Sequence, residues 1–171
     1  METAKRESLF KQGVDEHMGI FLKTARGFTA DSANRDDLVQ EMLLATWQSL
    51  PSYNGRCKLS TFLYRVAHNR ALNWKRSLTR YDRKLETFSV HAQIALDPNE
   101  PTSRRQLLDW LYATIRRLPP LDRSLIMLHL DRLPHRDIAE VTGLSEGNVA
   151  VRIHRIKQWL STQKQGDADE P

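Results

Sequence analysis

The chain has 171 residues, of which 40% are hydrophobic, so it can form one compact core or two small ones. It contains no apolar run of the roughly 20 residues that span a membrane and no apolar signal core near its N-terminus, so we expect a cytoplasmic protein without membrane insertion. Cys57 is the only cysteine, which excludes an internal disulfide and a cysteine-based zinc site.

The formal net charge of +5 is unevenly distributed along the chain. Residues 56–84 contain nine lysines and arginines and one acidic residue, a net charge of +8. A localised basic segment favours a polyanion as the partner, although a run of charge is also typical of an ordinary solvated helix face.

Apolar spacing predicts two helices in the first part of the chain. The first covers Ser8–Phe28 and the second covers Leu38–Leu50, where Pro51 ends the pattern. The polar residues 31–37 between them are rich in helix-capping side chains and are expected to form a turn.

A turn over residues 52–56 precedes a third predicted helix with a strongly basic face. Its apolar positions cover Leu59–Trp74, with Ser60 or Thr61 as the expected cap. Helical periodicity is then lost, and two prolines favour an extended connection. We therefore place a linker over residues 85–103, after a first domain over residues 8–84.

The second domain, over residues 104–164, is expected to be entirely helical. Helices are predicted over Arg104–Leu118, where two prolines follow, and over Leu121–Leu130. Residues 165–171 form an acidic tail that we expect to be disordered. No segment shows strand-like alternation, so the fold class is all-α, with two small helical domains joined by a flexible linker.

The pattern of a DNA-reading helix-turn-helix ends the second domain. One helix runs from Pro134 to Thr142, Gly143 ends it in the left-handed conformation, and Ser145 caps a second helix that runs to Leu160. Its expected core consists of Ile138, Leu144, Val149, Ile153 and Ile156, and its outward polar residues are Glu146, Asn148, Arg152 and Arg155. The alternative is a packed helical hairpin with a solvated basic face.

Catalytic and metal-binding signals are weak. His129 and His135 have a spacing similar to that in zinc fingers, but no cysteine pair precedes them, so we expect no metal. The sequence has no nucleophile–base pair, carboxylate metal cluster or phosphate-binding glycine loop, so we expect no cofactor and no enzymatic activity, including that of a nuclease.

Three segments in this order resemble the extracytoplasmic-function (ECF) group of bacterial sigma factors of the sigma-70 family. They are the acidic segment Asp36–Met42, the segment Leu59–Asn69 with the basic run after it, and the helix-turn-helix. The resemblance covers nearly the whole chain and implies sigma regions 2 and 4 without a large region 3. It implies a factor that directs promoter-specific transcription initiation, with core RNA polymerase and promoter DNA as partners and an anti-sigma factor as a plausible inhibitor.

The resemblance also implies site residues. The clamp of the polymerase largest subunit would bind Asp36, Asp37, Gln40 and Glu41, and the polymerase flap would be a further contact. The minus-ten element would bind Asn54, Arg56, Lys58, Tyr64, Arg65, His68, Asn69, Asn73, Trp74, Lys75 and Arg76. The minus-thirty-five element would bind Arg136, Ser145, Glu146, Asn148, Arg152, His154 and Arg155.

Some residues depart from the family pattern. Phe62 stands where many members have Trp, and it and Trp74 can be core residues instead of base platforms. Ala150 and Val151 replace polar or basic residues common in the recognition helix, so we expect readout to depend on Asn148, Arg152 and Arg155. An autonomous dimeric helix-turn-helix regulator is the alternative function, and no evident dimerisation helix supports it.

Overall fold

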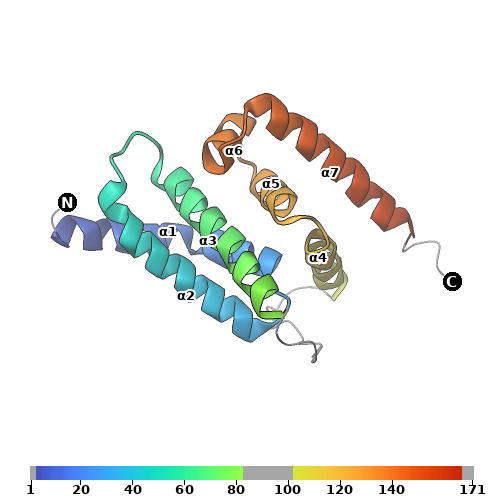
Figure 1. Ribbon diagram of the computed structural model, residues 1–171, viewed down its shortest axis with the longest axis horizontal. Helices are drawn as coiled ribbons and strands as arrows, with labels where there is room; N and C mark the ends of the chain where they lie inside the picture. Colours follow the sequence, from blue (N-terminus) through green and yellow to red (C-terminus); the bar gives the residue numbers. More distant parts are fainter. Residues whose placement is uncertain (1–2, 83–101, 167–171) are drawn as a thin grey trace. The chain divides into compact units, whose positions relative to one another are not determined.

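The described part of the chain consists of helices arranged in two compact units. The computed structural model describes residues 3–82 and 102–166, with side chains over 3–74 and 103–163 (Figure 1). One unit precedes the undescribed residues 83–101 and the other follows them. No β-strand occurs in the described ranges, which confirms the predicted all-α class.

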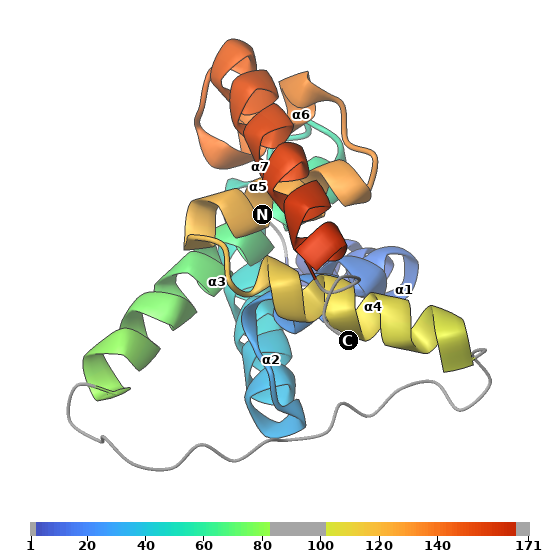
Figure 2. The same ribbon diagram turned by 90° about the vertical axis from the view of Figure 1, so that its right-hand side faces the viewer.

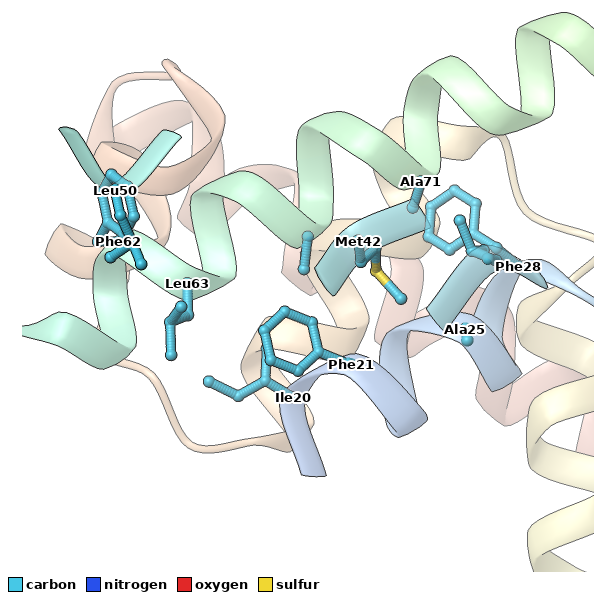
Figure 3. Close-up of a cluster of buried hydrophobic side chains, with 11 residues drawn as sticks. Ile20, Phe21, Ala25, Phe28, Met42, Leu50, Phe62, Leu63 and Ala71 are labelled. Carbon is cyan, nitrogen blue, oxygen red and sulfur yellow. The ribbon is translucent and has the colours of Figure 1, made fainter. Parts of the chain in front are cut away.

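The first unit packs three long helices around one core. These are α1 (Thr3–Phe28), α2 (Ser32–Ser49) and α3 (Leu59–Asp82), with a short 3-10 helix, η1 (Leu50–Ser52), after α2. Each long helix contacts the other two. Figure 3 shows side chains from these helices converging in the core, which contains Ile20, Phe21, Ala25, Phe28, Leu38, Met42, Leu50, Phe62, Leu63, Ala67 and Ala71.

The start of α2 differs from the prediction. Asp31 has extended backbone angles, and its carboxylate accepts a hydrogen bond from the backbone N–H of Asn34 at 2.7 Å. Because this cap satisfies a free N–H at the helix start, the helix begins at Ser32 and includes most of the predicted turn. Asp36 and Asp37 therefore lie in regular helix.

The start of α3 also differs. The helix begins at Leu59, and the backbone N–H of Phe62 donates to the carbonyl of Lys58 at 3.1 Å. Ser60 and Thr61 consequently lie inside the first turn and are not the cap. Phe62 is 4% exposed and its ring lies 5.1 Å from that of Tyr53, which makes it a core residue.

The second unit contains α4 (Thr102–Ile115), α5 (Pro120–Leu130), α6 (His135–Thr142) and α7 (Glu146–Gly166). Helices α5, α6 and α7 contact one another, and Figure 2 shows α7 crossing α5 and α6. The predicted linker lies outside the described residues, except for its last residues, which begin α4. The acidic tail also lies outside them, except for residues 165 and 166, which end α7.

A buried arginine joins the end of α4 to α5. Arg123 is 3% exposed, and its guanidinium donates to the carbonyl of Leu118 at 3.0 Å and to that of Arg116. Burial lowers the pKa of Arg123 to about 10, and the nearby charge of Arg116 contributes. The sequence did not reveal this role, because the contact depends on how the chain turns between the two helices.

The helix-turn-helix has the predicted turn. Gly143 ends α6 with a φ of +76°, and its N–H donates to the carbonyl of Ala139 at 2.8 Å. The Ser145 hydroxyl accepts from the N–H of Asn148 at 3.3 Å, so Ser145 caps α7 as predicted. Four of the five predicted core residues are buried: Ile138, Val149, Ile153 and Ile156. The fifth, Leu144, is only partly buried.

Candidate nucleic-acid and partner-binding surfaces

The predicted polymerase-binding residues form one surface on α2, which we call the acidic surface: Asp36, Asp37, Gln40 and Glu41. The first three side chains are exposed and Glu41 is partly buried. The opposite side of α2 carries Leu38 and Met42, both fully buried in the core. Since burial of that side fixes the rotation of the helix, the carboxylates and the amide face outward together.

A groove runs beside the acidic surface and contains two apolar side chains. Asp37, Gln40 and Glu41 line it together with Leu44 and Trp74. Leu44 is 52% exposed. The sequence analysis missed Leu44. Its exposure could have been predicted, because Leu44 lies outside the periodic apolar positions of α2. Trp74, assigned to the minus-ten element from sequence, lines this groove beside the acidic residues.

Glu41 and Arg70 join this surface to the basic face of α3. The Arg70 guanidinium donates to the Glu41 carboxylate in an ion pair between α2 and α3. The side chains are 34% (Arg70) and 40% (Glu41) exposed, so water screens the pair and it stabilises the fold by about 1 kcal/mol or less.

A second groove lies between α3 and the end of α2, and we call it the α3 groove. Its polar lining comes from Arg65, Asn69, Arg70 and Asn73 of α3. Arg65, Asn69 and Asn73 are four residues apart in sequence, which places them on one face of the helix. This groove combines two guanidinium groups, which can bind phosphates, with two amides, which can hydrogen-bond to bases. Its remaining lining residues are Ala45, Ser49, Ser52, Phe62 and Val66.

Other predicted minus-ten residues are not in this groove. His68 is 4% exposed, and its Nδ1 has no hydrogen-bond partner. Burial lowers the pKa of His68 to about 4, so the ring is neutral near pH 7. Because the His68 ring is buried, it is not available for a contact with DNA in this structure. Tyr64 packs partly buried against the core. Lys75 and Arg76 lie in α3, with side chains outside the described residues.

The loop before α3 exposes the three remaining predicted residues, Asn54, Arg56 and Lys58. The Asn54 side-chain oxygen accepts from the N–H of Arg56 at 3.1 Å, and Gly55 between them has a φ of +76°. The Tyr53 hydroxyl donates to the carbonyl of Cys57 at 3.0 Å. These bonds fix the course of the loop and leave the cationic side chains of Arg56 and Lys58 at the surface.

In the second unit, the recognition helix α7 exposes most of the predicted minus-thirty-five residues. Ser145, Glu146, Asn148, His154 and Arg155 are exposed. The predicted residue on α6, Arg136, is also exposed, and its Nε donates to the carboxylate of Asp137 at 3.3 Å.

Arg152 differs from these residues. Its Nε donates to the Asp122 carboxylate of α5 at 2.9 Å, and Asp122 is only 20% exposed. This ion pair links Arg152 to α5, while the Arg152 side chain stays 41% exposed beside Asn148 and Arg155. Asp122 could not be identified as its partner from the sequence, because the two residues are 30 positions apart.

Within the described ranges, no three histidine, cysteine, aspartate or glutamate side chains come together as a metal site. The rings of His129 and His135 lie 6.2 Å apart. Burial lowers the pKa of His129, and the nearby Lys157 and His135 lower it further. Among the same residues, no helix is long and apolar enough to cross a membrane.

Family models match both units of the chain. A model described as sigma-70 region 2 matches residues 14–81, and one described as sigma-70 region 4 matches residues 108–160. The first match covers the acidic surface and the α3 groove, and the second covers the helix-turn-helix.

Several curated proteins resemble the chain over most of its length. The ECF RNA polymerase sigma factor SigW of Bacillus subtilis is 28% identical over 138 residues, which covers 75% of this chain and 74% of that protein. The sigma factor YlaC of the same organism is 27% identical over 158 residues, with 90% and 88% covered. The ECF sigma-E factor of Escherichia coli is 26% identical over 144 residues, with 78% and 75% covered.

Two solved structures have a similar fold. The sigma factor RpoE of Bartonella quintana, crystallised with the anti-sigma factor NepR, has a TM-score of 0.75 and 19% identity, with 94% of this chain and 98% of that chain covered. CnrH, in complex with the cytosolic domain of CnrY, has a TM-score of 0.67 and 23% identity, with 94% and 89% covered.

Proposed function

The chain belongs to the ECF group of the sigma-70 family of bacterial RNA polymerase sigma factors, and from this premise we propose how its two units divide the work of promoter-specific initiation. The first unit, with proposed bounds 8–84, binds core polymerase and the minus-ten element. The second, with proposed bounds 104–164, binds the minus-thirty-five element. Residues 85–103 link them.

The acidic surface on α2 binds the clamp of the polymerase largest subunit. Asp36, Asp37 and Gln40 are exposed and can pair with basic side chains of a partner. Leu44 adds an apolar contact beside them, since it is 52% exposed and lines the same groove. The polymerase flap is the proposed contact of the second unit.

The α3 groove and the loop before α3 bind the minus-ten element. When the promoter opens, unpaired bases and their phosphates become available to α3. Arg65, Asn69 and Asn73 line the groove and supply a cation and two amides, and Arg56 and Lys58 extend the positive charge into the loop. His68 is buried and neutral, so in this proposal it makes no contact with DNA.

The exposed face of α7 binds the minus-thirty-five major groove, with its N-terminal turns deepest in the groove. Asn148 and Arg155 are the principal polar groups on this face, since Arg152 is held by Asp122. A domain of this size buries a modest interface, so the chain alone binds promoter DNA weakly. Its working affinity comes from being linked to a second site through the polymerase.

The protein has no catalytic activity of its own in this proposal, because nucleotide addition belongs to the polymerase. It works in the cytoplasm, where promoter DNA and polymerase meet. An anti-sigma factor is its proposed inhibitor, by analogy with RpoE of Bartonella quintana, which was crystallised with one.

The observation that carries the proposal is the position of two different surfaces on adjoining helices of the first unit. One is acidic with an exposed leucine and the other is basic with amides, as a bridge between a polymerase and DNA requires. The test is run-off transcription with purified core polymerase on genomic promoter fragments. We expect discrete transcripts that depend on the chain. An autonomous regulator would instead bind a duplex operator alone and support no transcript.

A further inference from the structure

Val151 lies at the centre of the exposed face of the recognition helix. The buried residues of α7 are Val149, Ile153 and Ile156. Successive residues of an α-helix are rotated by about 100°, so Val151 points almost opposite to the mean direction of these three. It is 52% exposed and lies in the second turn of α7, within reach of a groove that the start of the helix enters.

Polar groups flank Val151 on the same face. Asn148 and Arg155 are three residues before it and four after it, and all three residues line one groove. Arg152, the residue next to Val151, lines the same groove and is partly buried, with its Nε donating to the Asp122 carboxylate. The exposed stripe is therefore an amide, an apolar side chain and a guanidinium, in that order along the helix.

Thymine is the natural base that presents a methyl group in the major groove. An amide pairs with adenine and a guanidinium with guanine or phosphate, but valine has no hydrogen-bonding group. Single exposed apolar residues are common on protein surfaces, so exposure alone decides nothing. Val151 lies between Asn148 and Arg155, to which the proposed function assigns contacts with the minus-thirty-five element, so in that complex its side chain faces the edges of the bases.

We infer that Val151 recognises a thymine of the minus-thirty-five element through the C5-methyl group of that base, an inference that rests on the proposed function. Closing Val151 over the methyl group removes apolar surface of both from water. One buried methyl corresponds to about a fourfold gain in affinity. This contact supplies base discrimination without a hydrogen bond.

The test uses reconstituted holoenzyme and a promoter that it transcribes. Each thymine of the minus-thirty-five element, on either strand, is replaced singly by deoxyuridine, which removes only the methyl group. We expect one replacement to weaken equilibrium binding of the wild-type holoenzyme about fourfold. The Val151→Ala holoenzyme should bind the thymine and deoxyuridine forms at that position equally.

Leu130→Ala is the matched control. Leu130 is 48% exposed and ends α5, outside the recognition helix, so its truncation removes a similar exposed apolar group. The Leu130→Ala holoenzyme should keep the fourfold response. The inference is overturned if no deoxyuridine weakens wild-type binding, or if Val151→Ala responds as the wild type does. It is also overturned if Val151→Ala weakens binding to core polymerase without DNA, since the side chain would then contact the polymerase.

The two levels of failure are distinguishable. If the holoenzyme initiates normally at its promoter but no deoxyuridine replacement changes its binding, the role of Val151 is overturned and the proposed function is not affected. Absence of any transcript from the wild-type holoenzyme overturns the proposed function and the inference together.

Discussion

Glu41 and Arg70 form an ion pair that joins the acidic surface of α2 to the α3 groove. Each residue therefore takes part in an ion pair within the first unit and also lines a candidate binding surface. A substitution of Glu41 would disturb the basic face of α3 as well as the surface of α2. A clean test of polymerase binding has to leave this pair intact.

Asp37 and Gln40 meet that requirement, since both are exposed and it is Glu41 that pairs with Arg70. We expect Asp37→Lys with Gln40→Lys to weaken binding to core polymerase about 100-fold or more, because like charges brought together at an interface cost several kcal/mol. Far-ultraviolet circular dichroism should be unchanged. The measurement is the affinity of labelled protein for core polymerase at fixed ionic strength.

Helix α1 offers a matched control. Gln12 and Glu16 are an exposed glutamine and an exposed acid on α1, joined by a hydrogen bond of 3.3 Å from the Gln12 amide. Gln12→Lys with Glu16→Lys makes the same change of charge on a different helix of the same unit. If both double variants lose polymerase binding equally, net charge is responsible and the clamp assignment is wrong.

The Arg152–Asp122 ion pair leads to a second prediction, which concerns the stability of the second unit. Arg152→Ala should lower the stability of the second unit by about 1 kcal/mol or less, since the pair is partly exposed. Asp122→Asn should have a similar effect, and the double variant should lose little more than either single one. Urea denaturation followed by amide exchange of α5 and α7 measures this.

Alanine substitutions of Arg152 and Arg155 should have different effects on DNA binding. Arg155 is exposed, so Arg155→Ala should weaken binding of the minus-thirty-five element by the holoenzyme about tenfold or more, whereas Arg152→Ala should weaken it less than about threefold. A larger loss with Arg152→Ala than with Arg155→Ala would mean that Arg152 leaves Asp122 and contacts DNA in the complex.

His68 gives a prediction about pH. Its pKa in the folded chain is about 4, because the ring is buried, whereas an unfolded histidine titrates near about 6.5. Between these values the unfolded chain binds a proton that the folded chain does not. The free energy of unfolding of the first unit should therefore fall as pH decreases from about 6.5 to about 4, by up to about 3 kcal/mol.

Two measurements check this behaviour. The imidazole of His68, followed by NMR, should titrate near pH 4 in the folded chain. In His68→Leu, the protection of α3 amides from exchange should depend less on pH than in the wild type over the same range. A titration midpoint at the ordinary histidine value would show that the ring is open to solvent and restore it as a candidate for DNA contact.

The fold was largely predictable from periodicity, and the site only in part. The apolar spacing of α7 and the sequence from Gly143 to Ser145 predict the helix-turn-helix, since both depend on local backbone geometry. Two side-chain environments were not predicted. His68 has the spacing of an outward residue but is buried, and Arg152 is turned aside by Asp122, 30 residues away. Helix periodicity predicts on which face of a helix a residue lies, but it does not identify the side chains of other helices that pack against that residue.

The last prediction concerns the N-terminal turns of α1, which lie before the predicted start of this helix. The Arg6 Nε donates to the carbonyl of Trp47 at 3.0 Å, and its guanidinium lies 4.0 Å from the centre of the Trp47 ring. The ring of Phe10 packs edge-on against the same indole, with centroids 5.4 Å apart. One arginine thus satisfies a carbonyl near the end of α2 and stacks on a side chain of that helix.

Arg6→Met keeps much of the side-chain volume but removes both interactions, so we expect it to lower the free energy of unfolding of the first unit by about 1–2 kcal/mol. Lys5→Met is the control, because Lys5 is the neighbouring cation and is exposed. It should change stability by less than about 0.5 kcal/mol. The measurement is urea denaturation with Trp47 as the probe, each of the other three tryptophans being replaced by phenylalanine in every variant. Equal stability of Arg6→Met and Lys5→Met would mean that α1 packs on α2 through its apolar residues alone and that the arginine contributes nothing measurable.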